Sequence, residues 1–117
     1  MENKYDILGH TVEVIVDRPL GTYHPKYKTI FYTLNYGYIE GIIAGDGEEQ
    51  DAYILGVDVP VKSFKGKVIA VVHRLDDVED KWIVAPEGLV LSEEDIMKAV
   101  HFQEQFFKTE YYFLSLN

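Results

Sequence analysis

The 117-residue sequence contains no cysteine, which excludes disulfide bonds, a thiolate nucleophile and a zinc site with Cys ligands. It also has no apolar run that approaches the length of a membrane-spanning helix. The first ten residues, MENKYDILGH, lack the apolar core of a secretory signal peptide. From these absences we expect a cytoplasmic protein that has no membrane among its partners.

Positive charge is scarce: 11 Lys and Arg residues stand against 20 Asp and Glu residues, so the formal net charge is -9. Proteins that bind nucleic acid need a basic surface, so an OB-like nucleic-acid binder is the least favoured hypothesis. An acidic chain binds cations more readily, and through them it can bind anionic ligands. Apolar residues make up 47% of the chain and aromatic residues 14%, which is typical of a folded protein. We expect one domain spanning residues 1–117.

The apolar pattern predicts mainly β structure with one helix near the C-terminal end. Val12, Val14 and Val16 alternate with polar residues, as in a half-buried strand. The predicted strands are 10–17, 29–34, 36–44, 52–59, 66–75 and 81–86. Residues 18–28 contain two prolines and a glycine and are expected to form an excursion between strands. Five or six short strands and a terminal helix indicate a small barrel plugged by that helix.

The predicted helix covers residues 91–108, with Ser92 as its N-cap and Asp95 three residues later. Its apolar stripe is expected to consist of Ile96, Val100, Phe102 and Phe106.

Two acidic turns fall where one predicted strand gives way to the next. The first is DGEEQD at residues 46–51, and the second is DDVED at residues 76–80, followed at once by Lys81. Mg²⁺ prefers a few carboxylates together with water and ligand phosphates, and paired ions of this kind serve phosphoryl chemistry. Charge runs are nevertheless more often solvated loops, so two exposed turns are the competing interpretation.

Other polar residues have structural interpretations. Tyr32 and Tyr36 have the same strand parity and would point to one face near the acidic turn, where a phenol can donate to a phosphate. The histidines show no metal-ligand spacing. Arg74 is expected to pair with Asp76 or Asp77.

The segment FYTLNYGYIEG, followed by DGEEQDAYILG, resembles the metal-dependent inorganic pyrophosphatase family. That family has a Tyr-Pro-x-Asn-Tyr-Gly-Tyr-Ile strand and then Asp-x-Asp-x-x-Asp. HRLDDVEDKWIVAP is similar to its second acidic segment, and HFQEQFFK to its phosphate-binding terminal helix. The resemblance covers residues 30–108 and implies an OB-like barrel of five strands with helical additions.

The resemblance implies a site that hydrolyses pyrophosphate with Mg²⁺, or Mn²⁺, as cofactor. Glu48 and Asp51 would be catalytic residues that help to activate water. Phosphate would be held by Arg18, Tyr32, Tyr36, Lys81 and Lys108. The metal ligands would be Asp46, Glu48, Asp51, Asp76, Asp77 and Asp80, with Glu79 as an alternative to Asp80.

The sequence departs from the family pattern at several of these positions. Glu48 replaces the middle aspartate, Thr33 replaces the proline after Tyr32, and phenylalanine precedes Lys108 where the family has a phenol. The front hairpin that carries a glutamate, a lysine and an arginine in the family is contracted, and Lys28 falls near the position of the glutamate.

Two hypotheses follow from this pattern. The first is hydrolysis of pyrophosphate, or of a related phosphoanhydride, to phosphate. The second is a non-catalytic, divergent barrel that binds metal and phosphate ligands or a protein partner. In either case the expected ligand is a small phosphate compound, and self-association into a homo-oligomer is compatible with the many aromatic residues.

Overall fold

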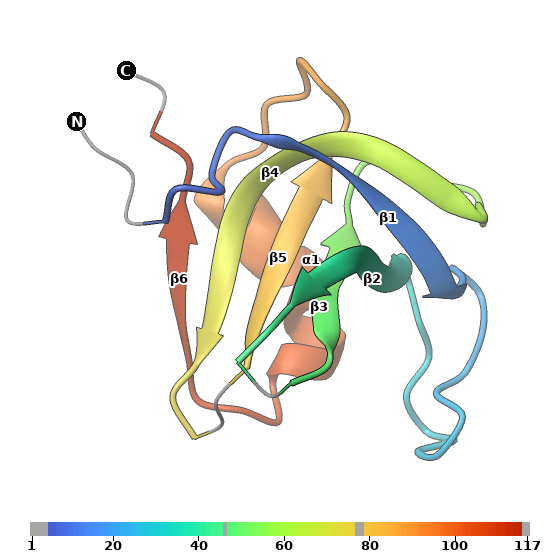
Figure 1. Cartoon of the computed structure of the whole chain (residues 1–117). Coiled ribbons are helices and arrows are strands. Elements are labelled where there is room, and N and C mark those ends of the chain that lie inside the picture. The colour runs from blue at the N-terminus through green and yellow to red at the C-terminus, as the bar shows by residue number, and fades with distance from the viewer. Residues whose placement is uncertain (1–4, 46, 77–78, 116–117) are drawn as a thin grey trace.

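A barrel of five strands is the centre of this computed structural model, which describes residues 5–45, 47–76 and 79–115. Its elements in chain order are β1 (Thr11–Arg18), β2 (Asn35–Ile43), β3 (Glu49–Ile54), β4 (Ser63–Arg74), β5 (Asp80–Ala85), α1 (Glu93–Glu104) and β6 (Thr109–Phe113). The strand order is β1-β2-β3-β5-β4, and β1 also pairs with β4, which closes the barrel. β6 pairs with β4 outside the closed ring (Figure 1). The predicted fold class is therefore confirmed.

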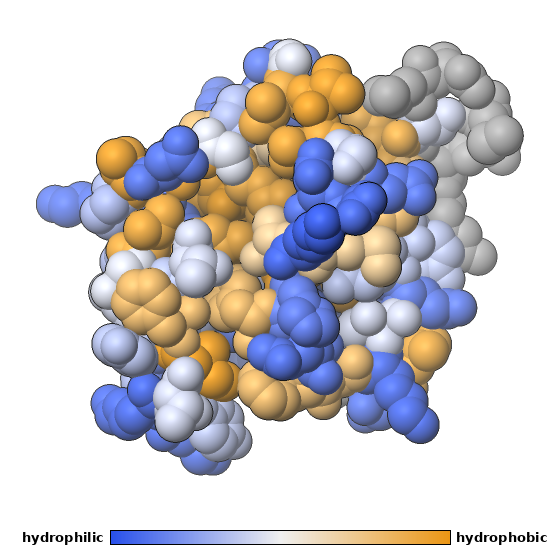
Figure 2. All heavy atoms as spheres, turned by 180° about the vertical axis from the view of Figure 1, so that it is seen from behind, coloured by the Kyte–Doolittle hydropathy of each residue, from blue (hydrophilic) through white to orange (hydrophobic). Residues whose placement is uncertain are grey.

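Alternation along the strands creates two apolar clusters, one on each side of the barrel wall. Every barrel strand contributes to the inner cluster: Val14, Ile39, Ala52, Ile54, Val68, Val71 and Val84, with Leu8 beside them. The outer cluster contains Tyr36, Tyr53, Val72 and Ile83, to which α1 adds two buried side chains, Ile96 and Val100. α1 therefore covers the outside of the sheet and does not enter the barrel. Figure 2 shows this covered side from behind, with hydrophilic side chains along its middle.

The long connection between β1 and β2 is not the strand that was predicted at residues 29–34. Phe31 makes only an isolated bridge with Tyr23. The segment bonds to itself instead: Gly21 donates to the Tyr32 carbonyl, and Tyr32 donates back to the Thr22 carbonyl. An excursion that satisfies its own backbone groups has no need of a neighbouring strand. The connection stands out to one side of the barrel (Figure 1).

The predicted helix is too long at its C-terminal end. α1 ends at Glu104, and the next residues turn so that Thr109–Phe113 can pair with β4 as β6. Phe106 lies in that turn with 63% of its surface exposed, so it is not part of the apolar stripe. No described helix is long and apolar enough to cross a membrane.

The start of α1 is capped as predicted. The Asp95 amide donates to Ser92 Oγ at 3.0 Å, and the Ser92 amide donates to the Asp95 carboxylate at 3.4 Å. Ser92→Ala removes one acceptor and is expected to lower the free energy of unfolding by about 1 kcal/mol in a denaturant titration. Glu94→Ala is the control, because it removes only an exposed pair with Lys98 and should change stability by less than about 0.5 kcal/mol. Equal effects of the two variants would contradict this interpretation.

Candidate functional site

A pocket of about 570 Å³ opens on the α1 side of the sheet, between the β1–β2 connection and the end of α1. Residues from β1, β2, β3, β4 and β5 reach it, so its floor belongs to the barrel wall. The pocket is lined by Asp17, Arg18, His24, Tyr27, Thr29, Ile30, Tyr36, Asp51, Arg74, Glu79, Lys81, Gln103, Phe106 and Phe107.

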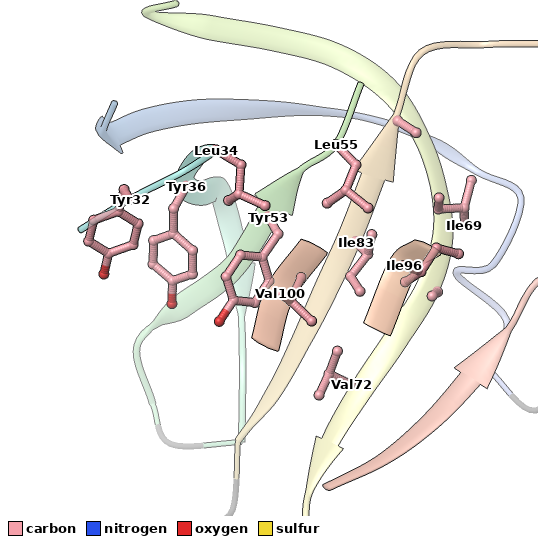
Figure 3. Close-up of a cluster of buried hydrophobic side chains, with 12 residues drawn as sticks. Tyr32, Leu34, Tyr36, Tyr53, Leu55, Ile69, Val72, Ile83, Ile96 and Val100 are labelled. Carbon is pink, nitrogen blue, oxygen red and sulfur yellow. The ribbon is translucent and has the colours of Figure 1, made fainter. Parts of the chain in front are cut away.

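Three tyrosines form a row beneath the pocket. In Figure 3 the hydroxyl groups of Tyr32, Tyr36 and Tyr53 point the same way, away from the aliphatic part of the outer cluster. Tyr36 and Tyr53 are paired across β2 and β3, with ring centroids 4.9 Å apart, and the Tyr32 ring lies 5.7 Å from that of Tyr36. Burial raises the pKa of Tyr36 and of Tyr53 well above the usual value, and Asp51 and Glu104, respectively, raise them further. Burial also raises the pKa of Tyr32, so all three phenols are neutral hydrogen-bonding groups at pH 7.

A buried ion pair ties α1 to β4 at the edge of this row. Arg74 Nε lies 3.1 Å from Glu104 Oε1, and Arg74 Nη2 lies 2.7 Å from Oε2. The Tyr53 hydroxyl donates to Glu104 Oε2 at 2.5 Å, and the Phe107 ring lies 3.6 Å from the guanidinium carbon. Burial alone would lower the pKa of Arg74, but Glu104 outweighs it and the pKa is raised. The guanidinium therefore stays charged although only 5% of the side chain is exposed.

From this ion pair, alternating charges continue across the floor of the pocket. Glu79 Oε2 lies 3.2 Å from Arg74 Nη1 and 3.0 Å from Lys81 Nζ. Lys81 Nζ in turn lies 2.5 Å from Asp51 Oδ2. The chain Asp51–Lys81–Glu79–Arg74–Glu104 thus holds its two cations between carboxylates, which fixes both cations at the pocket surface.

A β-bulge brings two adjacent residues of β1 to the same pocket. The register with β2 shifts between Val16 and Arg18, and such a shift allows neighbouring side chains to share a face. Arg18 Nη1 donates to the Tyr32 hydroxyl at 2.8 Å, and its guanidinium carbon lies 5.6 Å from the centre of the Tyr36 ring. Partial burial raises the pKa of Asp17, against the opposing effect of Arg18.

Five of the predicted site residues meet in this pocket: Arg18, Tyr36, Asp51, Lys81 and Glu79, the last of which was the alternative to Asp80. Tyr32 lies behind them and is fully buried. Its hydroxyl accepts from Arg18 and donates to Gln103 Oε1 at 2.7 Å. Tyr32 therefore positions Arg18 and does not line the pocket.

The remaining described members of the predicted site lie elsewhere. Glu48 is exposed before β3 and does not line the pocket. Asp80 points away from Lys81, its neighbour in β5, and its Oδ1 lies 2.6 Å from His73 Nδ1. Asp76 is exposed, with Oδ2 3.4 Å from the Lys108 amide nitrogen, and the side chain of Lys108 is not part of the lining. Asp46 and Asp77 lie outside the described residues.

The carboxylates of the pocket do not by themselves make a metal centre. Within residues 5–45, 47–76 and 79–115, no three His, Asp or Glu side chains are grouped so as to hold a metal ion. Asp51 and Glu79 both face the pocket, and each contacts Lys81. The predicted ligand set is therefore not assembled by its described members.

Sequence reasoning missed the part of the site that depends on α1. We expected Arg74 to pair with Asp76 or Asp77, whereas its partners among the described residues are Glu79 and Glu104. Strand parity with Val72 would have placed Arg74 on the outer face of β4, but nothing local points to Glu104. Asp17 was also missed, because alternation alone would turn it away from Arg18.

No protein-family model matches the sequence, and no curated protein matches it. The fold, however, matches solved structures of inorganic pyrophosphatases. The enzyme from Ehrlichia chaffeensis has a TM-score of 0.69 at 16% identity, over 97% of this chain and 92% of that one. The enzyme from Helicobacter pylori has a TM-score of 0.68 at 18% identity, over 97% and 89%. The chain therefore has the fold of the inorganic pyrophosphatases.

Proposed function

We propose that this protein hydrolyses pyrophosphate, or a related phosphoanhydride, to phosphate, with Mg²⁺ or Mn²⁺ as cofactor. The observation that carries the proposal is the convergence of Arg18, Arg74, Lys81 and Asp51 on one pocket. Its support is the fold, which matches solved structures of inorganic pyrophosphatases.

Three strands supply the groups that would bind phosphate oxygens. Arg18 is half-buried and Lys81 is only 3% exposed, but both line the pocket, and each lies within 6 Å of the centre of the Tyr36 ring. Fixed donors of this kind stabilise the charge that develops on a phosphoryl group without reorganising during the reaction. Arg74 adds a third cation, held in place by Glu104.

The reaction adds the oxygen of water to one phosphorus and breaks the bridging P–O bond. The bridging oxygen leaves with the second phosphate, and the water loses a proton to a nearby base. Asp51 is the predicted base that reaches the pocket, and Asp17 is a second carboxylate there. The raised pKa of Asp17 makes it a better proton acceptor than an ordinary aspartate. We infer the requirement for a divalent cation from the two acidic turns of the sequence, at residues 46–51 and 76–80. Chelation tests this requirement separately.

Phosphate release from pyrophosphate tests the proposal. Asp51→Asn and Lys81→Met are each expected to lower kcat by about 10²–10³-fold, and a chelator should abolish the Mg²⁺-supported rate. The matched controls are Asp58→Asn and Lys98→Met, which change exposed residues outside the pocket lining. If wild type and Asp51→Asn release phosphate at the same background rate, the enzymatic proposal fails.

A second candidate, binding without turnover, is favoured by the pairing of Asp51 with Lys81 and by the position of Glu48 outside the pocket. Calorimetry with pyrophosphate, with and without Mg²⁺, separates the two. Binding by wild type in the absence of any phosphate release would support this candidate over hydrolysis.

A further inference from the structure

We propose that the substrate of this pocket is a nucleotide, namely a nucleoside di- or triphosphate whose base stacks on Phe106 and Tyr27. This inference rests on the proposed function, because the phosphates would occupy the cationic floor already described. It adds a binding site for an aromatic group next to that floor.

The pocket has two chemically different parts. The floor carries Arg18, Lys81 and Asp51, whereas the rim carries aromatic rings from two separate segments of the chain. A volume of about 570 Å³ falls within the range of roughly 300–1,000 Å³ that small organic ligands occupy. Pyrophosphate has no organic part and would leave the aromatic rim without a partner.

Two rings of the rim are open to solvent. Phe106, directly after α1, is 63% exposed, and Tyr27, in the β1–β2 connection, is 53% exposed. The Phe107 ring has one face against the Arg74 guanidinium and is half-buried. Exposed rings beside a pocket offer planar apolar surface, on which a nucleic acid base stacks irrespective of its identity.

The surroundings of Tyr27 combine a neutral ring, His24, with the cation Lys26, whose Nζ lies 5.4 Å from the centre of the Tyr27 ring, and both suit a planar base that carries phosphates. The His24 ring lies 5.0 Å from the Tyr27 ring, and its Nδ1 accepts from the Lys26 and Tyr27 amides. Burial lowers the pKa of His24, and Arg18, Lys26 and Lys28 lower it further. The ring is therefore neutral at pH 7 and adds to the planar surface, while Arg18 lies toward the floor.

Hydrolysis of such a substrate follows the proposed reaction. The oxygen of water bonds to the terminal phosphorus, the bridging P–O bond breaks, and the bridging oxygen stays on the nucleoside part. A nucleoside triphosphate would thus give a nucleoside diphosphate and phosphate, with the proton of water passing to a pocket carboxylate.

The test compares ATP with inorganic triphosphate, which has the phosphates but no base. Dissociation constants are measured by calorimetry in the full chain carrying Asp51→Asn, where turnover is suppressed. We expect ATP to bind roughly tenfold more tightly or better, the effect of one stacked base. Phe106→Ala and Tyr27→Ala should each remove most of that difference and leave the affinity for inorganic triphosphate unchanged. Met97→Ala, an exposed α1 residue outside the lining, should change neither affinity.

Equal affinity for ATP and inorganic triphosphate, or no binding of either, would overturn the inference. So would a preference for ATP that persists in both Phe106→Ala and Tyr27→Ala. Phosphate release from pyrophosphate by the wild type is measured in parallel. Turnover of pyrophosphate without a preference for ATP would reject the nucleotide and leave the proposed function standing. A preference for ATP without any phosphate release would reject the proposed function and leave the nucleotide as a bound ligand.

Discussion

Arg74→Met is expected to lower the free energy of unfolding by about 3–5 kcal/mol, because it leaves a buried carboxylate without its cation. The Glu104 side chain is only 1% exposed, and Arg74 supplies two of its hydrogen bonds. Methionine keeps much of the apolar stem but removes the guanidinium that lies against the Phe107 ring, so the double variant described next is needed to isolate the effect of the charge. Urea denaturation followed by circular dichroism measures the change.

A second variant separates the ion pair from the rest of the network. Arg74→Met combined with Glu104→Gln removes the stranded charge and is expected to be more stable than Arg74→Met alone. The new glutamine side chain would still be within reach of the Tyr53 hydroxyl, which now lies 2.5 Å from Glu104 Oε2. If the double variant is no more stable than the single one, the charge is not the source of the loss.

Gly37→Ala is expected to destabilise the barrel by more than about 3 kcal/mol, since the new methyl group meets backbone that has nowhere to move. A Cβ at Gly37 would lie 1.9 Å from the Ile15 carbonyl oxygen and 2.9 Å from the Val16 Cα. This close approach of β2 to β1 lies next to the bulge that aims Arg18 into the pocket. The separated strands would therefore also misplace Arg18.

Gly21→Ala is the matched control for this prediction. Gly21 has a φ of 91°, and a Cβ there would meet no atom within 4 Å. Its cost is backbone strain alone, about 1–2 kcal/mol. If thermal melts show that Gly37→Ala lowers the melting temperature no more than Gly21→Ala does, then β1 and β2 can move apart at little cost.

The sequence predicts the barrel well because strand alternation is a local signal. Val12, Val14 and Val16 specify β1 without reference to the rest of the chain. The errors occur where long-range pairing decides. The apolar residues at 29–34 have the pattern of a strand, but their backbone bonds to residues 21–24 of the same connection. β6 forms by pairing with the edge of β4, which no local pattern predicts.

In the candidate site, too, the residues on neighbouring strands were predicted, whereas contacts between distant elements were not. The resemblance to the pyrophosphatase family grouped Asp51, Tyr36 and Lys81, and in the structure these residues lie on neighbouring strands and line one pocket. Arg74 could not be assigned its partner, because Glu104 lies 30 residues away on α1 while Asp76 is two residues away. A bulge, which no composition signal marks, moved Asp17 into the pocket.

The pairing of β1 with β4 also sets an order of events during protein synthesis. Thr11 faces Lys67 and Ile15 faces Ser63, so the ring cannot close until the chain has been made as far as these β4 residues. Arg74 and Lys81 are added only after that point, and Glu104 comes later still. Because β5 stands between β3 and β4 in the ring, the barrel wall is complete only once Ala85 has been made. Until α1 follows, Glu79 is the carboxylate partner available to Arg74, and the buried pair with Glu104 forms last.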